Sequence, residues 1–160
     1  MTRVGHGFDA HPLVEGRPLV LGGVTIPFER GAQGHSDADV LAHALADALL
    51  GAAALGDLGG RFPDRDARWK DADSMELLAS CASAVRDAGW RIVNVDATIV
   101  VDKPRLFSHV PRMRKNVAQR LGIALDCVSV KAKSSEGLGY TGDGSGIAAY
   151  AVAALSGSSE

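Results

Sequence analysis

Residues 35–52, HSDADVLAHALADALLGA, contain the clearest periodic pattern of the chain and decide the fold. Apolar residues recur there at helical spacing, at Leu41, Ala44, Leu45, Ala48, Leu49 and Ala52. Ser36 followed by Asp39 resembles a capping box with Asp in the acidic place, so we predict a helix over about 37–54 capped by Ser36. Backbone N–H groups at that helix start, together with His35, offer a site for a phosphate.

The residues before this helix favour strands. Residues 3–8 and 17–26 carry apolar residues punctuated by glycine, and we expect these two pieces to pair. The stretch GRPLVLGGVTIP is typical of a hairpin that turns about Gly22 and Gly23.

The residues after the helix alternate between helices and strands. A long loop is predicted over 56–73, followed by a helix that Ser74 caps and that runs to about Ala88. The further expectations are a long strand from residue 90 that stops near Pro104, a helix over 111–121, a short strand over 127–134 and a strand over 146–157. Length also allows a helix over 146–157, but its alternating pattern favours a strand, whose small residues allow close packing against another copy.

The order of elements predicts an α+β fold, with a mixed or antiparallel sheet and helices on one face. The chain has 160 residues, of which 46% are hydrophobic, which suits one domain. We expect a single catalytic domain over 1–157 and a short polar tail over 158–160.

Composition argues against several function classes. The net charge is −2, and Lys and Arg are scattered along the sequence, so it contains no basic cluster of the kind that binds nucleic acid. The longest apolar stretches fall short of the roughly 20 residues that cross a bilayer, so no membrane partner is expected. Cys81 and Cys127 form no C-x-x-C motif, and the start of the chain has no signal-peptide pattern, which predicts a cytoplasmic protein.

Asp9 and His11 are the first candidate metal ligands. Residues at i and i+2 of a strand point to the same face, so both side chains can bind one ion, together with His43 from the helix. Two imidazoles and a carboxylate suit Zn²⁺, and three protein ligands leave a fourth position open for a substrate. Asp39 and Asp47 flank His43 at i+4 steps, so a carboxylate of this stripe is expected to orient its ring. The alternative is a solvated acidic face with an incidental histidine.

A second candidate site is the glycine-rich stretch KAKSSEGLGYTGDGSG, residues 131–146. Ser134 and Ser135 supply hydroxyl donors and Glu136 a hard oxygen ligand, a combination that suits a diphosphate with bound Mg²⁺. The alternative is a plain glycine-rich turn between strands.

Several motifs in order along nearly the whole chain resemble the 2-C-methyl-D-erythritol 2,4-cyclodiphosphate synthase family. The most specific are GHGFDAH at 5–11 and HSDADVLAH at 35–43, followed by NVDATIV at 94–100 and VSVKAKSSEGLGYTG at 128–142. The resemblance implies a step of the non-mevalonate isoprenoid route, in which 4-diphosphocytidyl-2-C-methyl-D-erythritol 2-phosphate is converted into the cyclic diphosphate and CMP. It also implies a homotrimer with active sites between neighbouring subunits.

The resemblance assigns roles to named residues. Zinc is held by Asp9, His11 and His43, and the second metal, Mg²⁺ or Mn²⁺, lies near Glu136. The catalytic pair is His35, which with Ser36 positions the attacking 2-phosphate, and Ser134, which acts on the diphosphate. The methylerythritol loop comprises Asp57, Leu58, Gly59, Phe62, Pro63, Asp64, Arg65 and Asp66. Cytosine is received by Val101, Asp102, Lys103, Pro104, Arg105, Leu106 and Phe107. The remaining substrate contacts are Lys133, Ser135 and Tyr140.

One position departs from the family pattern. Asp143 stands where the family often has arginine, and Ser145 where an acid is common. A carboxylate repels anions, so we expect no diphosphate contact at Asp143.

Two other functions remain open. One is a zinc-dependent phosphohydrolase in which a metal-bound water is the nucleophile. The other is a non-catalytic trimeric scaffold or ligand-binding module, which binds metal or nucleotide without turnover.

Overall fold

The computed structural model describes residues 1–157, so the polar tail predicted at 158–160 lies outside the described residues. Its strands are β1 (Thr2–Glu15), β2 (Leu19–Leu21), β3 (Val24–Ile26), β4 (Arg30–Ala32), β5 (Trp90–Val100), β6 (Val128–Lys133) and β7 (Gly146–Gly157). Its α-helices are α1 (Val40–Ala53), α2 (Leu58–Arg61), α3 (Ser74–Asp87), α4 (Val110–Leu121) and α5 (Gly139–Gly142). Short 3-10 turns lie at Ala67–Trp69, Phe107–His109 and Leu125–Cys127.

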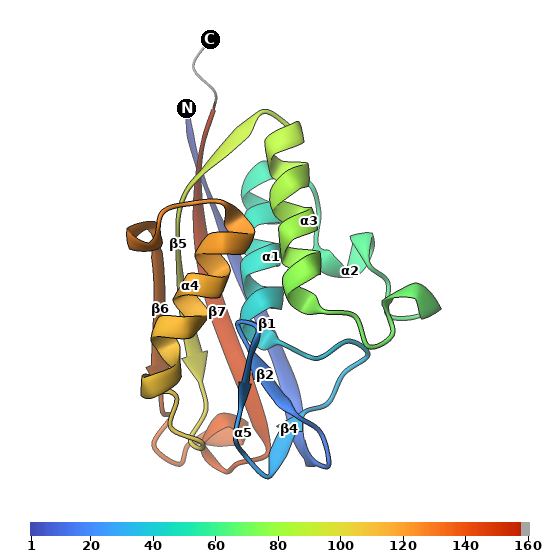
Figure 1. The fold of residues 1–160 in the computed structure, drawn as a ribbon, viewed down its shortest axis with the longest axis vertical. Helices are drawn as coiled ribbons and strands as arrows, with labels where there is room; N and C mark the ends of the chain where they lie inside the picture. Colours follow the sequence, from blue (N-terminus) through green and yellow to red (C-terminus); the bar gives the residue numbers. More distant parts are fainter. Residues whose placement is uncertain (158–160) are drawn as a thin grey trace.

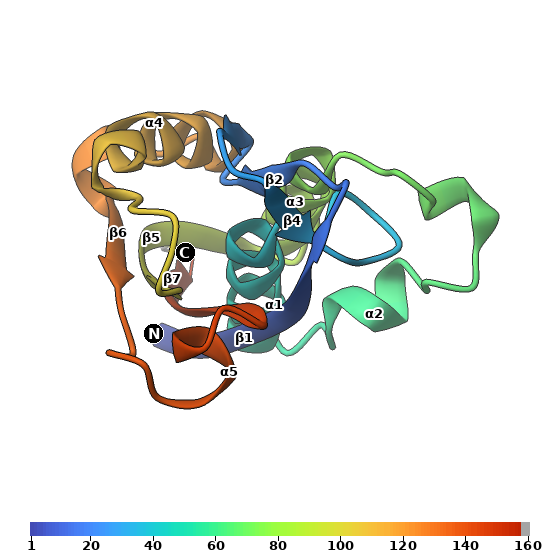
Figure 2. The ribbon, with the colours of Figure 1, turned by 90° about the horizontal axis from the view of Figure 1, so that it is seen from below.

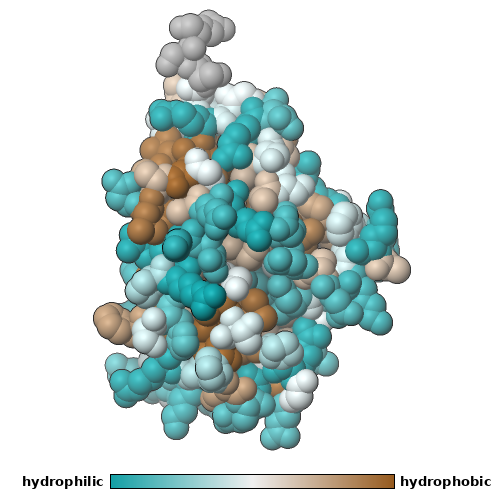
Figure 3. Space-filling view, in the orientation of Figure 1, coloured by the Kyte–Doolittle hydropathy of each residue, from teal (hydrophilic) through white to brown (hydrophobic). Residues whose placement is uncertain are grey.

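Five strands form a mixed sheet in the order β4-β1-β7-β5-β6, in which β5 and β6 are parallel and the other neighbours antiparallel. The helices α1, α3 and α4 cover one face of this sheet, and α1 lies between the sheet and α3 (Figures 1 and 2). The helical side of the molecule is largely hydrophilic at its surface (Figure 3). The predicted α+β fold with helices on one face is therefore confirmed.

The contact between β1 and α1 depends on glycine. A Cβ atom at Gly7 would lie 1.8 Å from the Ala44 carbonyl oxygen, and one at Gly5 would lie 2.1 Å from that of Ala48. No side chain fits at these separations, so the strand and helix backbones approach as closely as two glycines and a row of alanines permit. This contact places residues 9 and 11 of β1 beside residue 43 of α1.

The hairpin at Gly22 and Gly23 is confirmed, and both glycines have positive φ, at 55° and 71°. The predicted pairing of residues 3–8 with 17–26 is wrong. β2 and β3 form a separate two-stranded sheet, whereas β1 pairs with β7 along its length and with β4 at its end. The twelve-residue β7 offers β1 a longer antiparallel ladder than the three-residue strands of the hairpin.

Both predicted helix caps are displaced. Asp39, not Ser36, caps α1, and its side chain accepts a hydrogen bond from the Ala42 N–H. Asp73, not Ser74, caps α3. The Asp39 carboxylate takes the Ala42 N–H at the start of α1, so that donor is not available to the phosphate that we predicted there.

The strand over 146–157 is confirmed, but its small residues have another partner than we expected. Ala149, Ala151 and Ala153 are buried under α1 of the same chain, so they do not face another copy. The opposite, uncovered face of the sheet exposes larger apolar residues, among them Phe8, Tyr150 and Val152. Phe8 and Tyr150 are in ring contact at 5.1 Å between centroids.

The segment predicted as a loop over 56–73 contains α2 and one 3-10 turn and projects from the side of the molecule (Figure 2). Among the described residues, every helix is too short or too polar to cross a bilayer.

Candidate functional site

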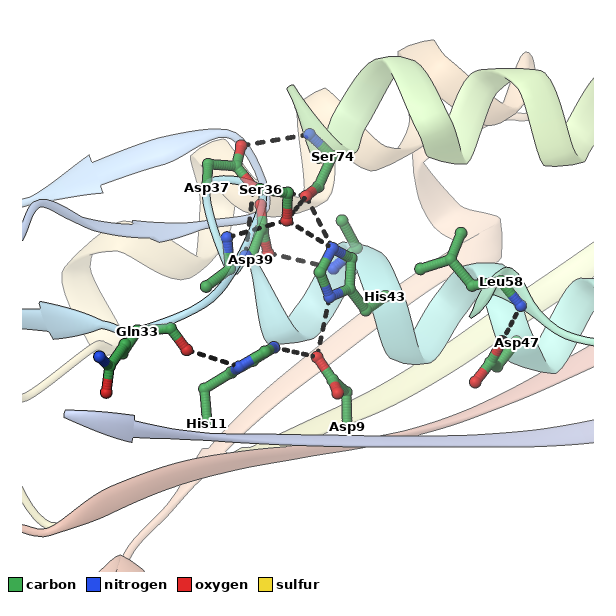
Figure 4. Close-up of polar contacts among 12 residues, drawn as sticks. Asp9, His11, Gln33, Ser36, Asp37, Asp39, His43, Asp47, Leu58 and Ser74 are labelled. Atoms are coloured by element: carbon green, nitrogen blue, oxygen red, sulfur yellow. Dashed lines mark hydrogen bonds and ion pairs between the residues drawn. The ribbon is translucent and has the colours of Figure 1, made fainter. Parts of the chain in front are cut away.

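Asp9, His11 and His43 come together as predicted, and their ligand atoms all lie within 4.8 Å of one another. Asp9 and His11 point from β1 toward α1, from which His43 points back (Figure 4). Asp9 Oδ2 lies 3.0 Å from His11 Nε2 and 2.9 Å from His43 Nδ1. One carboxylate oxygen and two imidazole nitrogens thus surround a common point, which makes this a candidate metal site.

The hydrogen bonding of His11 fits a metal ligand. Its Nδ1 lies 2.8 Å from the Gln33 carbonyl oxygen, which can only accept, so Nδ1 carries the proton. Nε2 of the neutral ring then has a lone pair, is buried, and makes no well-aligned hydrogen bond even though Asp9 Oδ2 is near. A cation between these two electron-rich atoms would satisfy both, and a backbone carbonyl behind the ring is a common support for a ligating histidine.

His43 is enclosed by polar groups from three segments. Its Nε2 lies 2.8 Å from Ser74 Oγ at the start of α3 and 3.3 Å from Ser36 Oγ. Its Nδ1 faces Asp9, so the two ring nitrogens have separate partners. Nδ1, the predicted ligand atom, and the Ser74 and Ser36 hydroxyls that contact Nε2 therefore lie on opposite sides of the imidazole ring.

Charge interactions reinforce this arrangement. Burial raises the pKa of Asp9, but contacts with His11 and His43 outweigh burial and lower that pKa to about 2. Burial lowers the pKa of His43, but the hydrogen bond and negative charge of Asp9 raise it above its usual value. The Asp9 side chain is therefore ionised at neutral pH. Nδ1 of His43 lies where a cation is favoured, either a proton or a metal ion.

The carboxylates that we expected to orient His43 have other partners. Asp39 is fully buried and accepts hydrogen bonds from Gly22 and Gly23 as well as Ala42. Asp47 accepts from the Leu58 N–H at 2.7 Å, and burial raises its pKa. The i+4 stripe is real, but these side chains connect α1 to the hairpin and to α2, so the prediction that they orient the ring is wrong.

A pocket of about 390 Å³ opens beside the triplet. Nine predicted site residues line it: Asp9, His11, His35, Ser36, His43, Leu58, Gly59, Phe62 and Asp64. Four predicted residues of the loop, Asp57, Pro63, Arg65 and Asp66, are outside its lining. Asp57 caps α2, and Asp66 caps the following 3-10 turn and pairs with Arg68.

A second pocket, of about 310 Å³, lies at β6 and the segment after β5. Its lining includes eight predicted residues: Val101, Asp102, Pro104, Arg105, Leu106, Phe107, Lys133 and Ser134. Lys103 is not part of that lining.

The glycine-rich stretch is folded on itself. Ser134 Oγ accepts from the Glu136 N–H at 2.9 Å, and the Ser135 hydroxyl is hydrogen-bonded to that of Thr141. Glu136 has a positive φ of 52° and is exposed. Tyr140 lies apart from the second pocket and lines a small cavity beside His11.

The Asp143 carboxylate also forms its hydrogen bonds within its own turn. Its Oδ1 accepts hydrogen bonds from the backbone and hydroxyl of Ser145, at 2.9 and 2.6 Å. These bonds lower the pKa of Asp143, so a negative charge stands at this turn.

The two pockets lie apart within one chain and share no lining residue. Gly5 and Gly7 face α1, so by strand alternation Asp9 and His11 also face the helices. Ala132 and Lys133, neighbours that point to opposite faces of β6, both line the second pocket, so this pocket lies at the end of the strand. β7 and β5 separate β1 from β6, a lateral distance of about 14 Å.

Three residues that support the site were absent from the sequence predictions in that role. Ser74 and Asp37 make hydrogen bonds behind His43, and Arg17 donates to the carbonyl oxygens of Ala32 and Ser36 and so holds the segment before α1. Ser74 and Asp37 flank buried helix starts, which was the available signal, but their partners are distant in sequence. Nothing in the local pattern around Arg17 points to its role.

Comparisons with known proteins find relatives over nearly the whole chain. The model of the YgbB family matches residues 2–156. The 2-C-methyl-D-erythritol 2,4-cyclodiphosphate synthase of Salinibacter ruber is 57% identical over 153 residues, which cover 96% of this chain and 98% of the relative. The synthase of the same name from Burkholderia cenocepacia is 58% identical, over 96% of this chain and 95% of the relative.

Solved structures are also similar. A 2C-methyl-D-erythritol-2,4-cyclodiphosphate synthase in a CDP-bound form has a TM-score of 0.89 and 38% identity, over 96% of this chain and all of the other. The bifunctional IspDF of Campylobacter jejuni has a TM-score of 0.93 and 41% identity, over 97% of this chain and 42% of that longer chain. With a family model that spans nearly all of its length and relatives above half identity, this chain belongs to the YgbB family.

Proposed function

We propose that this protein is a 2-C-methyl-D-erythritol 2,4-cyclodiphosphate synthase, which converts 4-diphosphocytidyl-2-C-methyl-D-erythritol 2-phosphate into the cyclic diphosphate with release of CMP. The observation that carries the proposal is the triplet of Asp9, His11 and His43 at the side of a pocket in a member of this family. Three protein ligands leave room for a substrate oxygen, as in catalytic rather than structural sites.

The reaction is an intramolecular phosphoryl transfer. An oxygen of the 2-phosphate forms a bond to the β-phosphorus, and the bond from that phosphorus to the bridging oxygen breaks. The bridging oxygen keeps the electron pair and leaves as part of CMP. A zinc ion held by the triplet would neutralise phosphate charge as a Lewis acid. His35 and Ser36 orient the attacking phosphate, and the loop over 57–73 excludes water that would otherwise hydrolyse the substrate.

The active site is proposed to form between subunits of a homotrimer. The metal pocket and the pocket at Lys133 and Ser134 share no lining residue and belong to β1 and β6, three positions apart in the sheet, so the proposal takes the second pocket from a neighbouring chain. The exposed apolar residues Phe8, Tyr150 and Val152 on the uncovered sheet face supply a surface for such association.

The remaining assignments complete the proposal. The exposed carboxylate of Glu136 is available to a Mg²⁺ or Mn²⁺ ion that accompanies the substrate diphosphate. Cys81 and Cys127 are free thiols, which suits the reducing cytoplasm in which we expect the enzyme to act.

The test is to incubate the purified protein with the cytidylylated substrate, Zn²⁺ and Mg²⁺, and to identify the products by mass. We expect CMP and a cyclic diphosphate. His43→Ala should lose both bound zinc and turnover, because one of three ligands is gone. Asp143→Ala should keep the full zinc content, because that carboxylate lies outside the metal pocket.

The outcomes separate the competing functions. A linear phosphate product would identify a phosphohydrolase, and metal or nucleotide binding without turnover would identify a binding module. Full zinc content and full activity in His43→Ala would refute the metal assignment itself.

A further inference from the structure

We infer that Ser74, held by Asp37, is a positioning residue that commits Nδ1 of His43 to the metal. The inference rests on the proposed metal site and concerns residues that touch neither the metal nor the substrate. Ser74 is 1% exposed, and its hydroxyl lies on the far side of the His43 ring from Asp9 (Figure 4).

The direction of the hydrogen bonds follows from the carboxylate of Asp37. Its Oδ1 accepts from the Ser74 hydroxyl, and its Oδ2 accepts from the Ser74 backbone N–H at 3.2 Å. A carboxylate can only accept, so the hydroxyl hydrogen of Ser74 is used by Asp37. The Ser74 oxygen therefore presents a lone pair to His43 Nε2 at 2.8 Å, and Nε2–H donates to it.

This chain of donors determines the tautomer of His43. With the proton on Nε2, the lone pair of the neutral ring lies on Nδ1, which faces Asp9 Oδ2 at 2.9 Å. If the hydroxyl of Ser74 were absent, Nε2–H would lose its buried acceptor, and the proton would move more readily to Nδ1, where it excludes the metal.

Ser36 is a weaker partner for the same nitrogen. Its Oγ is 3.3 Å from His43 Nε2, and it already accepts from the Ala38 N–H at 3.2 Å. Ser74 makes the shorter contact with His43 Nε2. Asp37, which accepts the hydroxyl hydrogen of Ser74, also accepts a hydrogen bond from the Asp39 N–H at 3.2 Å. The support of His43 thus comes chiefly from the start of α3.

The two histidines use opposite nitrogens, which makes the inference selective. His11 donates Nδ1–H to the Gln33 carbonyl and presents Nε2 to the site, whereas His43 donates Nε2–H and presents Nδ1. A change at Ser74 should therefore affect the N–H group of His43 and leave that of His11 unchanged.

The experiment uses the full-length protein loaded with Co²⁺, whose paramagnetism separates the exchangeable N–H resonances of ligating imidazoles in proton NMR spectra. We expect two such resonances in the wild type. Ser74→Ala should broaden the one from His43 alone through faster solvent exchange, and should weaken metal affinity, measured by chelator competition, by about 10–100-fold. Ser74→Thr keeps a hydroxyl and should restore both signals.

The matched control is Ser80→Ala, which removes an exposed hydroxyl from the same helix and should change neither readout. Should Ser74→Ala not fold, Asp37→Asn is the second variant. Its amide can donate to Ser74 Oγ, so the same broadening and a loss of affinity are expected.

The inference is overturned if the wild type binds Co²⁺ but Ser74→Ala matches it in both readouts, or if threonine is as defective as alanine. Failure of the wild-type protein to bind any divalent ion would instead refute the proposed metal site, and with it this inference. The two failures are distinguished by the wild-type titration alone.

Discussion

The buried carboxylate of Asp39 joins the β2–β3 turn to the start of α1. Its two oxygens accept three backbone N–H bonds, from Gly22, Gly23 and Ala42, at 2.9–3.1 Å. Burial raises the pKa of Asp39 to about 6, with the negative charge of Asp37 adding to the effect, although the three N–H bonds oppose it. This residue therefore matters for stability, although the sequence suggested a role at the metal site.

Asp39→Asn is expected to lower the free energy of unfolding by about 1–3 kcal/mol, because an amide oxygen cannot serve all three donors. Between pH 4 and pH 6 the folded wild type holds a proton that the unfolded chain has released, so its stability falls as pH rises through this range. The difference in unfolding free energy between the wild type and Asp39→Asn should therefore shrink as pH rises from 4 to 6. Denaturant unfolding from pH 4 to pH 7 measures it.

The control for this prediction is Asp87→Asn, which changes an exposed carboxylate at the end of α3. A gap between wild type and Asp39→Asn that widens from pH 4 to pH 6 would contradict the raised pKa.

As pH is lowered, the metal should be released at a higher pH than it would be if His43 had the pKa of an ordinary histidine. The pKa of His43 is raised, so protons compete for Nδ1 already above pH 6.5, while Asp9, with a pKa of about 2, stays ionised. Apparent Zn²⁺ affinity should fall by about tenfold per pH unit once His43 is protonated. Chelator competition between pH 8.5 and pH 6 tests this, and an affinity that stays constant over that range would count against His43 as a ligand.

The ligands could be predicted from the sequence, but their supports could not. The i and i+2 spacing of Asp9 and His11 is a local property of a strand, and the helix carrying His43 has an unmistakable period. Ser74 reaches His43 across 31 residues, and Asp37 reaches Ser74 across 37. Such contacts depend on how α3 packs on α1, which no local pattern encodes.

At the scale of elements, the glycine contact between β1 and α1 sets the width of the metal site. Gly7→Ala should push the helix from the strand, because the new Cβ would lie 1.8 Å from the Ala44 carbonyl oxygen. We expect a loss of roughly 1–3 kcal/mol or more in unfolding free energy. Metal affinity should also fall, since Asp9 and His43 are adjacent to the disturbed contact. Calorimetry and metal titration check the two effects.

Gly51→Ala is the control, at a glycine of α1, the helix that Gly7 of β1 contacts. A Cβ there would meet only the His6 carbonyl oxygen, at 3.9 Å, so the variant should gain about 0.5–1 kcal/mol and keep its metal. Equal metal loss in both variants would show that the close contact at Gly7 is not what holds the site.

Elements with a strong local signal were predicted well, and their partners less well. The helix α1, the hairpin at Gly22 and the strand β7 all follow from local period or turn chemistry. The partner of β1 is β7, more than 130 residues away, and a single chain offers no local signal for such a pairing. Caps were misplaced by one to three residues because Ser and Asp neighbour each other at both helix starts, and tertiary contacts select between them.

At the scale of the whole molecule, the proposed shared active site predicts complementation between two inactive variants. His43→Ala disables the metal pocket, and Lys133→Ala alters the separate pocket at the end of β6. After mixing, unfolding and refolding in equal amounts, about a quarter of the subunit contacts should combine two intact halves. Cyclase activity near that fraction of the wild-type value is expected.

The same mixture without refolding is the control, because exchange between intact trimers is then the only source of mixed contacts. Activity that stays at the background of the single variants after refolding would mean that each chain contains a complete site.

The separation of the two pockets also restricts how copies can assemble. A two-fold axis can fill both pockets only if they lie within one self-complementary patch, because residue i of one copy then meets residue j of the other and the reverse. In the proposed homotrimer, each chain presents the surface with one pocket to one neighbour and receives the other neighbour on the surface with the second pocket. Contacts of this head-to-tail kind either extend without limit or close into a ring, and in a closed ring every metal pocket has a neighbour.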